Sequence, residues 1–473
     1  MMDLDAELYQ PFLSDLLAKD NVTMIPKSGV VWKDLFEMIR SQLTEQTEVP
    51  TDSTPVRNDT LLVTANLSTF PKKSYHGFDS VSTMVLYQFM SSIRHSSLFQ
   101  RYGLVRMLIW VNDEDKRRII PRSIHRRKRS AFEAELSCEW VHEVAGLDVE
   151  VEDRTALRDE WINIESAANV AARMKEMGLK MPPGRQTNLH KRILADKRKL
   201  MGKKLAGVKP PTLTRPFKQE LDELEQEHKK SKSSEASKRL KALRTRDKYD
   251  QEDSTQYLSL LQEQEAAMTL YSSSPEAFAT ASAAWNERID NLKKNPRNEF
   301  KVLKDSYHIF RQNPPPLLWD RRQYEPLSIS PTEFFPNAPT ALLDIQPKAM
   351  HQLLRQHGQG SSRSGDMSDV MLRFWFHNTL LPIPKAMEGI WGGFGDSAAA
   401  CGSITDPKRG GSPMGENGAL TARCVNEEQW TEIMQAWMDW PFRPSYTQML
   451  GRLADDTEGE DDEGGKSGAT GLA

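Results

Sequence analysis

The chain contains 473 residues, and its 63 lysines and arginines nearly balance its 66 aspartates and glutamates, giving a formal net charge of −3 at pH 7. A chain of this length can form two or three domains, and its balanced charge means that only a local basic patch could bind nucleic acid. Its three cysteines have no C-x-x-C spacing, which argues against a zinc ribbon or a disulfide scaffold. No apolar run approaches the ~18 residues of a membrane span.

The N-terminal part alternates strand and helix patterns. Residues 1–5 resemble the end of a strand, and the apolar residues that follow, through Leu16, predict a helix directly after it. Residues 22–25 are compatible with a strand and residues 32–43 with an amphipathic helix. This alternation predicts a doubly wound α/β sheet. The segment is acidic, unlike an arginine-rich transit peptide, so by itself it indicates the cytosol.

Residues 61–111 carry the clearest pattern of the chain. A short apolar run at 61–65 predicts a buried strand, residues 81–98 predict a helix capped by Ser80 or Asp79, and residues 104–111 predict a second buried strand. Strand, helix and strand with short connections form a βαβ unit, whose two strands are parallel. Ligands gather at the carboxyl ends of such strands, which is where Asn66 should lie.

A dense basic segment follows the second strand. We expect Pro121 in the first turn of a helix whose buried stripe is Phe132, Leu136 and Trp140. Two interpretations of its cations stay open: a solvated helix face, or a contact with the phosphate backbone of a nucleic acid. The candidate nucleic-acid-binding residues are Lys116, Arg117, Arg118, Arg122, Arg126, Arg127, Lys128 and Arg129.

The remaining chain divides into four stretches. Charged helical patterns from about 146 to 311 predict a long helical and partly mobile insertion, and residues 340–345 predict one more buried strand. Helical patterns at 371–381 and 430–440, separated by a glycine-rich loop, predict a small helical C-terminal domain whose tryptophans and methionines belong to its core. The acidic end from Asp455 onward should be disordered.

Most motifs of catalysis are missing from the sequence. Gly464-Gly465-Lys466-Ser467 resembles the end of a phosphate-binding loop, but Glu460 stands where the first glycine should be and no strand precedes it. The histidines lack the spacing of metal ligands, so we predict no metal site. There is no G-x-S-x-G and no plausible serine or cysteine triad.

Several segments nevertheless resemble one family, in the right order. These are Met2-Asp3-Leu4-Asp5, Ala65-Asn66-Leu67-Ser68, Leu104 to Val111, Arg117 to Gly146, and Phe334-Phe335-Pro336 through Ile345. The chain resembles the ribosomal-RNA adenine N6-dimethyltransferases, and more closely their offshoot, the fungal mitochondrial transcription factors. The resemblance implies a Rossmann-like S-adenosylmethionine-dependent methyltransferase sheet and a small helical C-terminal domain. It also implies that Asp3 would accept the cofactor's ribose hydroxyls and that Asn66 would accept the amine of the target adenine.

Departures from the family pattern concern every part of the reaction. The family's glycine-rich cofactor loop would precede Met1, which implies either a truncated, N-terminally incomplete chain or a lost site. The acid expected after the third strand is replaced by Ser28 or Gly29. The catalytic loop remnant is Asn66, Leu67, Ser68 and Thr69, in which Ser68 replaces a proline and Thr69 an aromatic residue that stacks on the base. We therefore expect no bound S-adenosylmethionine and assign no catalytic residue.

The resemblance implies a mitochondrial transcription initiation factor that binds promoter DNA and mitochondrial RNA polymerase. Two alternatives stay open: an active rRNA adenine N6-dimethyltransferase of the mitochondrial small subunit, and a non-catalytic RNA-binding protein of mitochondrial ribosome assembly. The expected divisions are a core at 1–146, the insertion at 147–313, a return to the sheet at 314–348, the C-terminal domain at 349–454 and the tail at 455–473.

Overall fold

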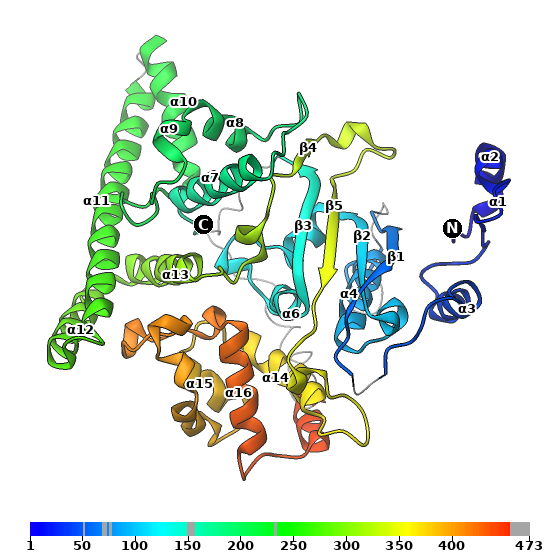
Figure 1. Cartoon of the computed structure of the whole chain (residues 1–473). Coiled ribbons are helices and arrows are strands. Elements are labelled where there is room, and N and C mark those ends of the chain that lie inside the picture. Colours follow the sequence, from blue (N-terminus) through cyan, green and yellow to red (C-terminus); the bar gives the residue numbers. More distant parts are fainter. Residues whose placement is uncertain (51–52, 69–72, 75–77, 149–156, 231–233, 455–473) are drawn as a thin grey trace.

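The computed structural model describes residues 1–50, 53–68, 73–74, 78–148, 157–230 and 234–454. They form a mixed α/β fold around one five-stranded sheet. Figure 1 shows the insertion on one side of this sheet, the N-terminal segment on the other and the C-terminal helices at one end. Among these residues, no helix is both long enough and apolar enough to cross a membrane.

The sheet combines parallel and antiparallel pairs. Its strands are β1 (Arg57–Asn66), β2 (Leu104–Asn112), β3 (Cys138–Leu147), β4 (Leu327–Ile329) and β5 (Thr340–Pro347). Their order across the sheet is β1-β2-β5-β3-β4. The pairs β1–β2 and β3–β4 are parallel, whereas β5 lies antiparallel between β2 and β3. The α/β class is thus confirmed, and the strand predicted at 340–345 lies at the centre of the sheet.

The predicted βαβ unit is confirmed. The hydroxyl of Ser80 accepts a hydrogen bond from the backbone N–H of Thr83 at 3.0 Å and so caps α4 (Val81–Arg94), whose Val85 and Phe89 pack into the core of the sheet. The helix ends at Arg94, earlier than predicted, because the chain turns into the short 3₁₀ helix η2 (Leu98–Tyr102). Gly103 then has a φ of +111°, and a Cβ there would lie 2.7 Å from the carbonyl oxygen of Val56.

The N-terminal segment differs from its prediction. The two expected strands are reduced to one parallel bridge between Met2 and Ile25, outside the sheet. The helix expected between them is divided into α1 (Ala6–Tyr9), η1 (Gln10–Phe12) and α2 (Ser14–Leu17), because Pro11 lacks the N–H that a continuous helix needs. The predicted amphipathic helix is α3 (Trp32–Gln42), whose Leu35 and Ile39 join the core of the sheet.

The prediction of a long basic helix after β2 is wrong. The structure has α5 (Asp113–Ile119), η3 (Ile124–Arg126) and α6 (Arg129–Ser137) instead. Pro121 lies between α5 and η3, where it excludes its neighbour Ile120 from helical geometry, at φ −118° and ψ 71°. Phe132 and Leu136 are buried on α6 as predicted, but Trp140 belongs to β3.

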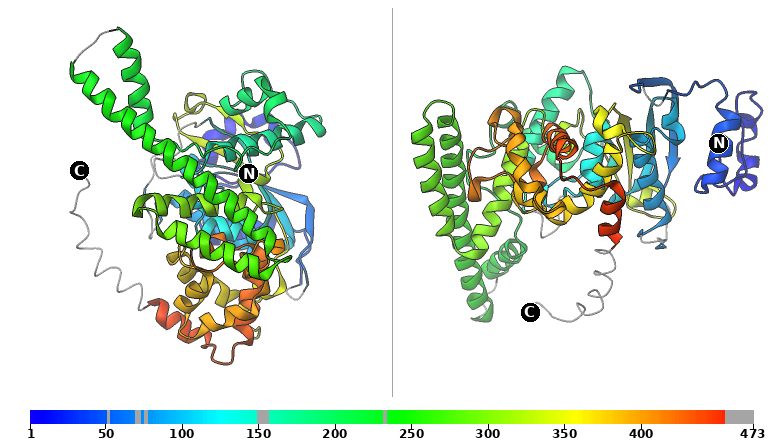
Figure 2. Two further views of the ribbon diagram at one scale, coloured as in Figure 1. Left: turned by 90° about the vertical axis from the view of Figure 1, so that its left-hand side faces the viewer. Right: turned by 90° about the horizontal axis from the view of Figure 1, so that it is seen from below.

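The insertion is helical, as predicted. Its helices are α7 (Glu160–Glu176), α8 (Asn188–Ala195), α9 (Lys197–Leu200), α10 (Pro216–Lys230), α11 (Ser234–Leu270), α12 (Pro275–Asp290) and α13 (Lys294–Arg311). The insertion has its own hydrophobic core, which includes Trp285, Phe300 and Tyr257. It therefore forms a packed layer. Figure 2 shows the hairpin of α10 and α11 extending beyond the remaining layers.

The C-terminal part forms a compact helical unit below the sheet in Figure 1. It contains α14 (Ser364–His377), α15 (Ile383–Ile390) and α16 (Glu427–Asp439), and short 3₁₀ helices occupy the predicted glycine-rich loop. Trp375, Trp430 and Trp437 are fully buried, which confirms that the tryptophans form core. The tail predicted from Asp455 onward lies outside the described residues, as does Thr69.

Candidate functional site at the carboxyl ends of the parallel strands

Asn66 is the last residue of β1, as predicted, and pairs with Trp110 of β2. Its side-chain oxygen accepts hydrogen bonds from the backbone N–H of Ser68 at 3.1 Å and from the hydroxyl of Ser68 at 2.6 Å. The next residue, Leu67, is buried and donates its N–H to the carbonyl of Trp110 at 2.8 Å. The chain therefore turns at the end of the strand, and the oxygen of Asn66 is engaged in fixing that turn.

Beside it, the end of β2 carries a buried polar network. The carboxylate of Asp115 accepts hydrogen bonds from the hydroxyl of Thr83 at 2.9 Å and from the side-chain amide of Asn112 at 3.4 Å. Thr83 in turn contacts the capping hydroxyl of Ser80 at 2.8 Å. These contacts fasten the start of α4 to the end of β2, so the network holds the βαβ unit together.

Lys116 occupies the centre of a second buried cluster. Its Nζ lies 2.7 Å from Oδ1 of Asp113 and 2.8 Å from Oε1 of Glu143, and only 3% of the residue is exposed. Burial raises the pKa of Asp113, but the cations Lys116, Arg117 and Arg122 outweigh it and hold that pKa below its ordinary value. The carboxylate of Asp113 is therefore ionised and paired with its neighbouring cations, an arrangement that stabilises the fold.

Most of the remaining cations of the predicted basic face also form contacts within the protein. Arg117 pairs with Asp113 at 2.7 Å, and Arg129 pairs with Glu133 at 2.7 Å. The further ionic partners are Asp79 for Arg118, Glu143 for Arg122 and Glu135 for Arg127. Arg122 also lies 4.0 Å from the centre of the Trp319 ring. Lys128 is exposed and Arg126 is half-buried.

Most cations of the segment at 116–129 are thus paired with carboxylates of the same protein, and Lys116 and Arg127 are buried. Their main partners, Glu133, Glu135 and Glu143, follow the segment on α6 and β3. A run of cations is conspicuous in a sequence, whereas the carboxylates that neutralise it come together with it only when the chain folds.

The exposed basic surface lies instead in the insertion. Between 191 and 204 the chain has seven lysines and arginines and one acid, Asp196. Ile193 anchors α8 in the interior, and the N–H of Asn188, at the start of that helix, donates to the carboxylate of Asp148 at 2.7 Å. Asp148 directly follows β3, so this basic surface begins near the carboxyl end of that strand, as Figure 1 shows.

Several of these cations have no counter-ion. Arg192 pairs with Glu160, and Lys204 pairs with Glu265. Four other cations are exposed and form no ion pair with any residue in the described ranges: Lys191, Lys197, Arg198 and Lys203. The signal was present in the sequence as a charged run, but only the fold distinguishes it from the neutralised run at 116–129.

The polar side chains proposed for the cofactor site form hydrogen bonds with their own neighbours in the sequence. Asp3 is exposed, lies outside any helix or strand, and accepts a hydrogen bond from the N–H of Asp5 at 2.9 Å. Figures 1 and 2 show α1 and α2 beyond the β1 edge of the sheet, whereas Asn66 lies within the sheet on β1. Ser28 is buried, and its hydroxyl accepts the N–H of Val30 at 3.2 Å.

A large cavity of about 1190 Å³ lies away from this end of the sheet, between the insertion and the C-terminal helices. Its wall mixes cations and carboxylates that pair with one another, among them Lys204 with Glu265, and Arg409 with both Glu428 and Glu432. The wall thus carries charges of both signs, and its seven lysines and arginines outnumber its five glutamates.

Comparison with known proteins identifies no relative, since neither a family model nor a curated protein matches the chain.

Proposed function

We propose that this chain is a mitochondrial transcription initiation factor, built on a methyltransferase-like sheet, that binds promoter DNA together with mitochondrial RNA polymerase. The resemblance to the adenine dimethyltransferases supports the proposal. Its segments at 65–68, 104–111, 117–146 and 334–345 include parts of β1, β2, β3 and β5, which are neighbours in one sheet. Segments that resemble one domain in sequence are expected to share a core.

The observation that carries the nucleic-acid part of the proposal is the exposed basic surface of α8 and α9. The segment 191–204 contains seven lysines and arginines and one acid, and four of these cations are exposed without an ion pair to any described residue. Such a surface binds phosphates and releases counter-ions, which gives affinity with little dependence on base sequence. Promoter choice would then come from the complex with the polymerase.

The loop after β1 supports a role without chemistry. A base-stacking ring contributes ~1–3 kcal/mol to nucleotide binding, and Thr69 stands where the family has that ring. The side-chain oxygen of Asn66 already accepts two hydrogen bonds from Ser68, whereas the family uses it to accept one from the target adenine. The protein would therefore hold nucleic acid without transferring a methyl group to it.

The first test measures binding of a labelled promoter duplex at several salt concentrations. The variant carries Lys197→Glu, Arg198→Glu and Lys199→Glu on α9, and its matched control carries Lys238→Glu, Lys241→Glu and Lys248→Glu, all exposed on α11. We expect the α9 variant to lose affinity, with the slope of log K against log salt shallower by about 0.9 for each phosphate contact removed. The control should bind as the unmodified protein does.

The second test reconstitutes initiation with purified mitochondrial RNA polymerase on the same promoter. Promoter-dependent transcripts that require this chain would support the proposal. Preferential binding to ribosomal RNA, with no effect on the polymerase, would instead support the ribosome-assembly alternative. Incorporation of label from S-adenosylmethionine into a ribosomal-RNA hairpin would support the dimethyltransferase.

A further inference from the structure

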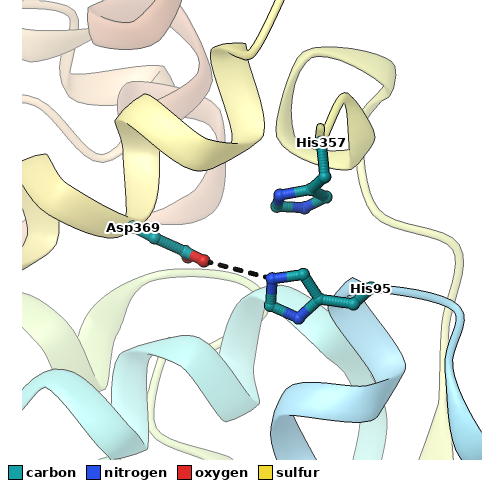
Figure 3. A group of neighbouring side chains, drawn as sticks. All are labelled: His95, His357 and Asp369. Carbon is teal, nitrogen blue, oxygen red and sulfur yellow. Dashed lines mark ion pairs between the residues drawn. The ribbon is translucent and has the colours of Figure 1, made fainter. Parts of the chain in front are cut away.

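Three potential metal ligands, far apart in the sequence, meet between α4 and the C-terminal helices. His95 follows the last residue of α4, His357 lies in the loop before α14, and Asp369 lies on α14. Figure 3 shows the two rings next to one another, tilted by 43°, and the carboxylate directed at His95. Nε2 of His95 is 3.6 Å from Oδ2 of Asp369, and the ring centres of the two histidines are 4.4 Å apart. One ligand atom from each residue lies within 4.8 Å of the other two.

Hydrogen bonds orient both imidazoles as ligands. Nδ1 of His95 lies 2.9 Å from the carbonyl oxygen of Ser91, and Nδ1 of His357 lies 3.0 Å from Oδ1 of Asp366. Because an oxygen acceptor of either kind requires an N–H, each Nδ1 carries the proton and each Nε2 keeps its lone pair. Histidines that bind metals usually donate their second nitrogen to a carbonyl or carboxylate in this way.

The group contains one buried nitrogen that no described residue satisfies. Nε2 of His357 is buried and has no hydrogen-bond partner among the described residues. Leaving a buried polar atom without a partner is unfavourable, and the lone pair of this nitrogen can coordinate a metal ion. The oriented lone pair on His95 and the oxygen of Asp369 complete a nitrogen, nitrogen and oxygen donor set.

We propose that His95, His357 and Asp369 bind a divalent transition metal, with Zn²⁺ the best match to the donor set, and that the ion fastens the C-terminal helical unit to the sheet layer. Imidazole and carboxylate donors suit zinc, whereas Mg²⁺ and Ca²⁺ require oxygen ligands. Adjacent ligand atoms around a tetrahedral zinc lie about 3.3 Å apart, which is close to the 3.6 Å between His95 and Asp369. His95 is partly exposed, which leaves room for water as a further ligand.

Arg94 holds the carboxylate of Asp369 in place and partly offsets its negative charge. Arg94 donates to Oδ1 of Asp369 and to Oε1 of Glu133, so one cation is shared by two carboxylates. Oδ2 of Asp369 remains directed at His95. The proposal is independent of the proposed function, since it concerns how two parts of the fold are joined.

The test adds Zn²⁺ to the full chain after treatment with EDTA, and measures stoichiometry by calorimetry and melting by circular dichroism. We expect one ion per chain and a rise in the melting temperature, because the metal binds the folded state. His357→Gln and Asp369→Asn should abolish both effects. Asp366→Asn, which removes only the orienting acceptor, should weaken binding by about 10–100-fold. The exposed His377→Gln is the matched control.

Cobalt provides a readout that a merely structural role of the histidines would not move. Co²⁺ bound to the full chain should show visible absorption typical of low coordination number, which disappears in His95→Gln and persists in His377→Gln. Binding that survives in all three ligand variants, or no binding above that of a chelator-treated blank, would overturn the proposal. Competition by Mg²⁺ at equal concentration would overturn the assignment to a transition metal.

Discussion

Arg127 and Glu135 form an ion pair buried beneath the C-terminal helical unit. Nε of Arg127 donates to Oε1 of Glu135 at 3.0 Å and to Oε2 at 3.1 Å, and the arginine is 1% exposed. The same guanidinium donates to the carbonyl oxygens of Arg423 at 2.5 Å and Val425 at 2.8 Å. One side chain thus connects the segment before α6 with the turn before α16.

Arg127→Met should destabilise the protein strongly. The change leaves the carboxylate of Glu135 and two carbonyl oxygens buried without their donor, and breaking such a pair costs about 3–5 kcal/mol. The measurement is the free energy of unfolding in urea. Lys128→Met, at the exposed neighbouring position, should change it by no more than about 0.5 kcal/mol.

Reversing the charges of Arg126, Arg127 and Arg129 should affect folding before it affects nucleic-acid binding. We expect the triple change to glutamate to unfold the protein, because two of the three arginines form internal ion pairs. If the triple variant melted normally and lost only nucleic-acid binding, the assignment of these pairs to structure would be wrong.

Adenine methylation should be undetectable. Methyl transfer needs the donor held in line with the adenine nitrogen, yet the side-chain oxygen of Asn66 is hydrogen-bonded to Ser68 and Thr69 stands in place of the stacking ring. The assay incubates the protein with labelled S-adenosylmethionine and a ribosomal-RNA hairpin bearing adjacent adenines. Label that appears with the unmodified chain and disappears in Asn66→Ala would favour the dimethyltransferase over the transcription factor.

Acid should destabilise the protein partly through His142. Burial, followed by the charges of Arg106 and Arg173, lowers the pKa of His142 to about 4 from an ordinary 6.5, against the opposing effect of Asp344. Between these values the unfolded chain binds a proton that the folded protein does not, so stability falls as the pH falls from 6.5 to 4. The loss attributable to this residue is about 3 kcal/mol at the acid end.

His142→Gln should therefore make the free energy of unfolding less dependent on pH in that range, as urea titrations at several pH values would measure. The exposed His377→Gln should retain the slope of the unmodified protein. Equal slopes in both variants would show that His142 does not contribute to acid sensitivity.

Gly103→Ala should destabilise the junction between η2 and β2. The residue combines a φ of +111° with 2.7 Å between a built Cβ and the carbonyl oxygen of Val56, so alanine meets both strain and a backbone clash. We expect the free energy of unfolding to fall by about 1–3 kcal/mol. Gly415→Ala, where a Cβ meets nothing within 4 Å and φ is −78°, should be close to neutral.

Local sequence patterns determined much of the scaffold. The unit of β1, α4 and β2, the capping by Ser80 and the position of Asn66 at the end of a strand followed from apolar periodicity and short connections. The helical insertion and the buried tryptophans of α14 and α16 followed from the same signals. These features are predictable because each depends on residues close together in the chain.

Tertiary structure alone decided which polar residues are available for function. Lys116 and Arg127 belong to a conspicuous basic run, but Glu143 and the carbonyls of Arg423 and Val425 neutralise or bind them in the interior. His95 and Asp369 meet although most of the chain separates them. An ion pair or a metal site depends on the distance between side chains in the folded protein, and periodicity along the sequence carries no information on contacts between distant segments.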